Sequence, residues 1–198
     1  CMTLNEHWGY HAHDEEWKSP REVIKMLLTC SIGKGNLLLN IGPRGDGSIP
    51  EASIQIVRQV GTWLKNGGSE LMQNLSPMRF SPGLRQPGEN GDWDAAGPCY
   101  TQEQRMFWIL FHYPGKQAVL SGLEMKVKAV SCRNFGRLEF VQNEDTITIT
   151  LPPAMEKELA PILLFDCDRA PSIYRTGGMR VPNVTHPRYD PVKPDIKY

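Results

Sequence analysis

Side chains that can exchange protons are concentrated near the start of this 198-residue chain. His7, His11 and His13 lie in one short segment, with Glu6 before them and the acidic run 14–16 after them. Carboxylates and imidazoles are the groups that most often serve as general acids, general bases and nucleophiles. This segment is therefore the first place where we expect a reactive site.

Structural roles compete with catalysis for most of these acids. Asp14, Glu15 and Glu16 come just before an expected helix, where the helix dipole favours negative charge. Asp46 stands before a glycine in an expected turn, which is a common position for aspartate. Glu6 has neither a capping nor a turn role, so we expect it to have the largest catalytic effect. The candidate catalytic acids are Glu6, Asp14 and Asp46.

The histidine-rich segment does not by itself predict a metal site. A His-x-His spacing arises often by chance, and no carboxylate is fixed beside it as a ligand. The five cysteines are odd in number, widely spaced and form no CxxC pair, so neither a disulfide framework nor a zinc site is predicted. We expect no metal and no cofactor.

The sequence directly after this segment predicts the elements that must position these residues. Ser19-Pro20-Arg21-Glu22 is a capping box with proline at the first helical position, which predicts a helix over 20–32. The apolar run 36–41, bounded by glycines, is typical of a parallel strand buried on both faces. Ser48 repeats the capping pattern before a second helix that begins near Glu51.

Beyond residue 68 the apolar period changes from that of a helix to that of a strand. Strands are expected at Met106 to Phe111, Met125 to Ala129, Thr146 to Leu151 and Ile162 to Phe165. Residues 76–168 should then form an antiparallel β-sandwich. The last segment, 169–198, is rich in proline and poor in apolar periodicity, which predicts an extended tail.

Composition limits the kinds of partner. Twenty-two basic and 22 acidic residues cancel, and no basic run could follow a phosphate backbone, so we expect no nucleic acid partner. No apolar run approaches the roughly 20 residues that span a bilayer, so no membrane partner is expected.

Several spaced segments resemble α-L-fucosidases of glycoside hydrolase family 29. In that family a Cys-Met-Thr segment leads to Trp-Gly-Tyr, an acidic stretch and Lys-Ser, and these stand here within 1–19. The family's Gly-Asn-Leu-Leu-Leu-Asn-Ile-Gly-Pro strand and turn stand at 35–43, followed by Asp46-Gly47 and Ile49-Pro50. A later Gly-x-Trp-Leu and Asn-Gly are matched within 61–67, after which the likeness thins.

The resemblance implies a fold and a reaction. It implies an α+β chain in which 1–75 is the helix-strand-helix end of a β/α barrel, 76–168 a β-sandwich and 169–198 the tail. Family members are metal-free retaining glycosidases, and such enzymes use two carboxyl groups about 5 Å apart. The family's nucleophilic aspartate has no counterpart in this chain, and in many members the acid/base glutamate lies just before the position of Cys1.

The resemblance also suggests how a fucoside would be held. Trp8 and Tyr10 can offer flat faces to a pyranose ring, and His7 and Arg44 can hydrogen-bond hydroxyls. The expected partner is a fucosylated glycan or a small fucoside.

Two functions remain open from the sequence. The chain is either an α-L-fucosidase completed by homo-oligomerisation or a non-catalytic carbohydrate-binding or structural module. A redox or metal enzyme has little support from the cysteine spacing. An activity assay with carboxylate variants separates the first two.

Overall fold

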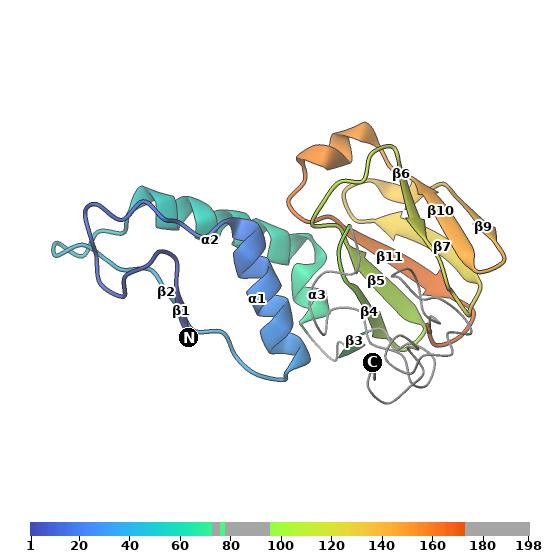
Figure 1. Cartoon of the computed structure of the whole chain (residues 1–198), viewed down its shortest axis with the longest axis horizontal. Coiled ribbons are helices and arrows are strands. Elements are labelled where there is room, and N and C mark those ends of the chain that lie inside the picture. Colours follow the sequence, from blue (N-terminus) through green and yellow to red (C-terminus); the bar gives the residue numbers. More distant parts are fainter. Residues whose placement is uncertain (73–75, 78–95, 173–198) are drawn as a thin grey trace, which may run out of the picture. The chain divides into compact units, whose positions relative to one another are not determined.

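The computed structural model describes residues 1–72, 76–77 and 96–172 of the chain. They belong to two compact units, Cys1–Asn74 and Leu75–Tyr198, and each is described by itself (Figure 1). Most of the proline-rich segment expected at 169–198 lies outside the described residues. Within the described ranges, none of the helices combines the length and the apolar character needed to cross a bilayer.

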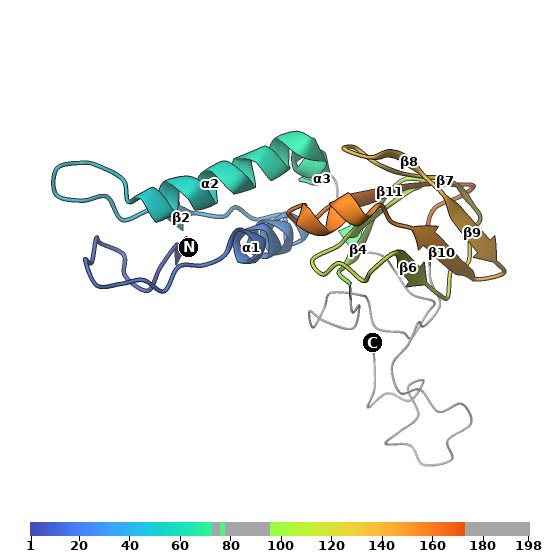
Figure 2. The same ribbon diagram turned by 90° about the horizontal axis from the view of Figure 1, so that it is seen from above.

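The first unit contains a parallel strand pair joined through a helix. Strand β1 (Met2–Thr3) pairs in parallel with β2 (Leu39–Asn40), and α1 (Pro20–Ile32) lies between them in sequence. Helix α2 (Glu51–Trp63) follows and packs along α1, as Figure 2 shows. A widened turn, η1 (Leu64–Gly68), and the short helix α3 (Ser69–Leu71) complete the unit.

Helix α1 forms as the capping box predicts. The Ser19 hydroxyl accepts a hydrogen bond from the Glu22 amide at 3.2 Å, and a Glu22 carboxylate oxygen accepts one from the Ser19 amide at 2.6 Å. These two bonds satisfy amides that have no partner inside the helix. Val23, Ile24 and Leu28 line its buried face. The predicted helix is confirmed with both of its ends.

Helix α2 begins where expected but is capped differently. Ser48, predicted as its cap, lies outside the helix, and Pro50 occupies the N-cap position without a side-chain hydrogen bond. The Ser48 amide and hydroxyl both donate to Asp46, at 2.9 and 2.7 Å. The capping prediction was therefore wrong, because Ser48 is bound to Asp46 within the turn and does not cap α2.

The strand predicted over 36–41 is shorter and less covered than its sequence suggests. Only Leu39–Asn40 pair as a strand, and Leu38 is 63% exposed. A two-stranded sheet of β1 and β2 has no further strands to bury both of its faces. The expected burial on both faces is thus wrong for this chain, and the sequence also missed β1.

The second unit contains two antiparallel sheets. The larger one has the order β3 (Ser76–Pro77), β4 (Cys99–Gln102), β5 (Arg105–Ile109), β11 (Ile162–Cys167), β7 (Val127–Cys132) and β8 (Gly136–Leu138). The smaller one has the order β6 (Gln117–Leu120), β10 (Thr146–Thr150) and β9 (Phe140–Asn143). A short 3-10 helix, η2 (Pro153–Lys157), precedes β11.

Side chains from both sheets share one apolar core, which makes the unit a β-sandwich. Trp108 and Phe165 of the larger sheet and Ile147 and Ile149 of the smaller one are at most 2% exposed within it. Buried residues alternate with less buried ones along β10 and β11, as a sheet with one buried face requires, whereas Trp108 lies in a stretch of β5 that is buried from Met106 to Ile109. The expected sandwich is present, with strand ends that differ by a few residues from those predicted.

Candidate functional site

All the candidate residues lie in two loops of the first unit, one after β1 and one after β2. The first loop carries Glu6, His7, Trp8, Tyr10 and Asp14, and the second carries Arg44 and Asp46. Because β1 and β2 are parallel, both loops leave the same edge of the sheet. In α/β folds, ligand sites are built at this carboxyl edge.

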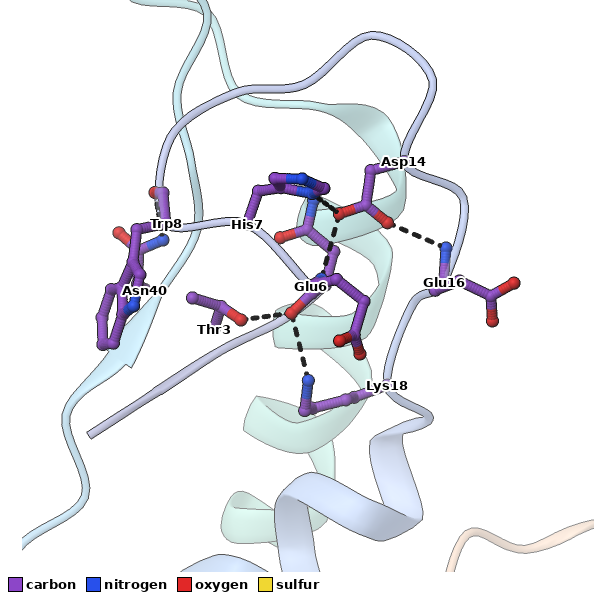
Figure 3. Close-up of polar contacts among 9 residues, drawn as sticks. Thr3, Glu6, His7, Trp8, Asp14, Glu16, Lys18 and Asn40 are labelled. Carbon is purple, nitrogen blue, oxygen red and sulfur yellow. Dashed lines mark hydrogen bonds and ion pairs between the residues drawn. The ribbon is translucent and has the colours of Figure 1, made fainter.

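Asp14 organises the first loop. One carboxylate oxygen, Oδ2, accepts hydrogen bonds from the Glu6 amide at 3.0 Å and from His7 Nδ1 at 2.7 Å (Figure 3). The other, Oδ1, accepts one from the Glu16 amide at 3.1 Å. The carboxylate side chain is only 2% exposed. These three bonds join residues on either side of the histidine-rich segment and fix the shape of the loop.

The same contacts keep Asp14 ionised. The hydrogen bond from His7 lowers the pKa of Asp14 most, and the Glu16 and Glu6 amides lower it further, against the opposing effect of desolvation. An ionised carboxylate accepts hydrogen bonds and cannot donate them. Asp14 therefore lacks the proton that a general acid must supply.

The structure distinguishes three histidines that look equivalent in the sequence. His7 alone among them bonds Asp14, and its side chain is 52% exposed. The His11 ring stacks on His7 with a centroid separation of 4.4 Å and an interplanar angle of 8°. His13 meets His11 edge-on at 6.0 Å. His7 is thus the histidine held by both a carboxylate and a stacked ring.

The base of this loop is closed by bonds to consecutive backbone carbonyls. The Lys18 amine donates to the Asn5 carbonyl at 3.1 Å, and the Thr3 hydroxyl donates to the same oxygen. The Lys18 amide donates to the Leu4 carbonyl at 2.7 Å. These contacts bring the two ends of the loop together at the end of β1.

Trp8 is held through its backbone and leaves its ring exposed. The Asn40 side-chain amide, at the end of β2, donates to the Trp8 carbonyl at 2.6 Å (Figure 3). The Trp8 side chain remains available to a ligand, since the residue is 59% exposed. Sequence reasoning missed Asn40. Its signal was the polar residue that interrupts the apolar run at the end of a strand.

The second loop meets the first through Tyr10. The Arg44 guanidinium carbon lies 5.2 Å from the centroid of the Tyr10 ring, within range of a cation–π contact. Gly42 has φ +52°, and a Cβ there would lie 3.4 Å from the Gly9 carbonyl oxygen. The glycine thus allows the two loops to approach closely.

Asp46 and Glu6 differ in what their carboxylates touch. Asp46 Oδ1 is bound by Ser48 within its own turn, and these bonds lower the pKa of Asp46. The Glu6 residue is exposed, and in the described part of the chain no hydrogen bond or ion pair engages its carboxylate. The structure therefore leaves Glu6 as the candidate acid with an unoccupied carboxylate.

A metal site is not formed by the residues that the structure describes. Among them, no three or more histidine, cysteine, aspartate or glutamate side chains gather in a way that could hold an ion. No disulfide joins the five cysteines, all of which lie within the described residues, and Cys99, Cys132 and Cys167 are buried in the second unit.

Comparison with known proteins agrees with the sequence resemblance. A family model described as alpha-L-fucosidase matches residues 1–69. Plasma alpha-L-fucosidase from Rattus norvegicus is 43% identical over 77 residues, which are 37% of this chain and 17% of the rat protein. The chain therefore spans much less than the whole of this relative.

Solved structures are similar over both units of the chain. An alpha-L-fucosidase from Paenibacillus thiaminolyticus superposes with a TM-score of 0.66 and 24% identity, covering 85% of this chain and 39% of that one. The alpha-fucosidase of Thermotoga maritima, in complex with fucose, gives a TM-score of 0.57 at 21% identity, covering 83% and 38%. At these identities the likeness establishes the fold. Taken with the family match over residues 1–69, it shows that this chain is similar to a portion of the α-L-fucosidases.

Proposed function

We propose that this chain supplies part of the fucoside site of a retaining α-L-fucosidase. The observation that carries the proposal is the meeting of the two loops at the carboxyl ends of parallel strands, within the residues that match the family model. In this proposal Trp8 and Tyr10 offer faces to the sugar ring, while His7 and Arg44 bind its hydroxyls.

The first unit is proposed to be the end of a β/α barrel. A parallel strand pair with a helical crossover, followed by a second helix, is the repeating pattern of such barrels. By the same proposal, 1–75 is the barrel portion, 76–168 the sandwich domain and 169–198 an extended tail.

Glu6 is the acid that we propose to exchange protons with the substrate. Retaining glycosidases need one carboxyl group as nucleophile and a second as acid/base. Asp14 and Asp46 remain candidates, but they rank below Glu6 because hydrogen bonds already occupy oxygens of both. A second copy of the chain, as a homo-oligomer, is proposed to supply the carboxylate that completes the pair.

Replacement of Glu6 tests this assignment. Glu6→Gln keeps the shape of the side chain and removes the exchangeable proton, so release of aryl alcohol from an aryl α-L-fucoside should fall about 100-fold or more. Glu15→Gln, on the same loop and also exposed, is the matched control and should stay close to the parent. A Glu6→Gln activity within about twofold of the parent contradicts the assignment.

The oligomer has its own test. The first unit leaves Leu38 exposed directly before β2, whose sheet has two strands within the described residues, and open apolar strand edges favour association. Leu38→Lys should therefore reduce the molar mass measured by light scattering. Val141→Lys, at an equally exposed apolar residue of the sandwich, should not reduce it. A parent chain that is a stable monomer at micromolar concentration contradicts the shared-site proposal.

A non-catalytic role is the second candidate, and the occupied carboxylates favour it. Only Glu6 among the three candidate acids keeps its carboxylate unengaged within the described residues. A carbohydrate-binding module would bind L-fucose without releasing aryl alcohol from a fucoside. Calorimetric titration with L-fucose beside the hydrolysis assay separates this role from the enzymatic one.

A further inference from the structure

We infer that Asp14 is a positioning residue, which fixes the Nδ1 proton of His7 and makes His7 Nε2 the atom that accepts a hydrogen bond from a ligand hydroxyl. The identity of that ligand, an α-L-fucoside, rests on the proposed function. The state of the His7 ring does not rest on it and can be measured without any ligand.

Asp14 is placed to orient rather than to react. Its carboxylate is 2% exposed, and its oxygens accept from two backbone amides and from His7. A buried acceptor loaded in this way has little capacity left for a substrate. Its contacts all lie inside the loop, so its effect on a ligand must pass through the groups that it holds.

The contact with Asp14 determines which nitrogen of His7 carries the proton. Nδ1 lies 2.7 Å from Oδ2 of a carboxylate that can only accept, so Nδ1 must be the donor. In the neutral imidazole the other nitrogen, Nε2, then has a free lone pair. Because the side chain is half exposed, this acceptor can be offered to a hydroxyl group.

Stacking holds the ring in this orientation. His11 lies parallel to His7 at 4.4 Å and covers one of its faces. A ring fixed at one nitrogen and on one face has little freedom to turn its remaining nitrogen away. Such restraint lowers the ordering cost of binding a ligand.

Protonation of Nε2 should remove the acceptor, so binding of the ligand hydroxyl should weaken toward acidic pH. We call this loss of binding the acidic limb. The charged and titratable groups around His7 are the Asp14 carboxylate, the stacked His11 ring, the adjacent Glu6 and Lys18 at the base of the loop. Once Nε2 is protonated it becomes a donor, and the hydroxyl loses its acceptor.

The tautomer is tested first, without ligand. Long-range proton–nitrogen spectra of the ¹⁵N-labelled chain should show neutral His7 protonated at Nδ1. Asp14→Ala should turn this into a mixture of both tautomers, whereas His13→Asn, which alters a ring that meets His11 edge-on, should leave it unchanged. A His7 ring protonated mainly at Nε2 in the parent overturns the inference.

Two replacements of His7 then test the roles of its two ring nitrogens separately. Asn at this position keeps an N–H near Nδ1 for Asp14 but has nothing at Nε2, whereas Gln reaches toward Nε2. His7→Asn should weaken binding of methyl α-L-fucopyranoside about 3- to 10-fold and abolish the acidic limb, and His7→Gln should restore part of the affinity.

The outcomes distinguish the inference from the proposed function. Binding by His7→Asn with parental affinity and pH dependence overturns the role of Nε2 while the proposed function stands. A parent that binds no fucoside, yet shows the Nδ1-protonated ring, overturns the proposed function and the ligand assignment and supports the positioning role of Asp14.

Discussion

Two glycines of the first unit should respond to alanine with opposite signs. Gly68 has ordinary helical angles, φ −58° and ψ −36°, so alanine brings no backbone strain there. A Cβ at Gly68, however, would lie 2.4 Å from Cε3 and Cζ3 of the Trp63 ring, which is 5% exposed and packed in the core. The indole must shift, and overpacking of this kind costs about 1–3 kcal/mol of unfolding free energy.

Gly61 provides the matched substitution. It lies inside α2, and a Cβ there would meet nothing within 4 Å. Alanine is favoured over glycine in a helix interior by about 0.5–1 kcal/mol. Gly61→Ala should therefore stabilise the same unit that Gly68→Ala destabilises.

Urea unfolding followed by circular dichroism at 222 nm is the assay, because the α-helices of the described residues all lie in the first unit. The midpoint should move up for Gly61→Ala and down for Gly68→Ala relative to the parent. Shifts of the same sign for both variants would refute the packing argument around Trp63.

Further predictions concern the helix cap and the sandwich. Ser19→Ala should cost about 1 kcal/mol of unfolding free energy, because it removes the acceptor of the Glu22 amide. The Ser19 amide and hydroxyl lower the pKa of Glu22. The stability contributed by ionised Glu22 is therefore present above its ordinary pKa and is lost as pH falls through the pKa of the folded state. Measuring the unfolding midpoint at a series of acidic pH values tests this. Gly97→Ala should prevent stable folding of the sandwich or cost more than about 3 kcal/mol, since a Cβ would lie 1.8 Å from the Ile109 carbonyl oxygen at φ +149°. Gly115→Ala, at φ +101° with nothing within 4 Å, should cost only about 1–2 kcal/mol in the same urea titration.

Local signals predicted the helical part of the fold well. The Ser19–Glu22 box and the spacing of Val23, Ile24 and Leu28 define α1, because all the interactions involved lie within one helix. Ser48 misled the same reasoning, since Asp46 competes for it two residues away. Whether a serine caps a helix depends on which nearby group it binds, and a pattern of residue types does not show that competition.

Long-range pairing was harder to predict. Strand β1 has only two residues, and its partner β2 lies across a whole helix in sequence, so no local period indicates β1 or its pairing with β2. In the sandwich, the alternating β10 was predicted, whereas the short strands β3, β4, β6, β8 and β9 were missed.

The candidate site was located by residue type, but its roles needed coordinates. The sequence named His7 and Asp14 separately, and nothing in the spacing indicated that they bond each other or that His11 stacks on His7. Asn40 was absent from the candidates because its role is to hold a backbone carbonyl.

The stereochemistry of fucoside hydrolysis tests the central proposal most directly. Proton NMR of an aryl α-L-fucoside incubated with the purified chain should show α-L-fucose as the first product, before mutarotation, because a retaining mechanism passes through two displacements. First appearance of the β-anomer, or no hydrolysis above buffer in a monodisperse sample, would contradict the proposal.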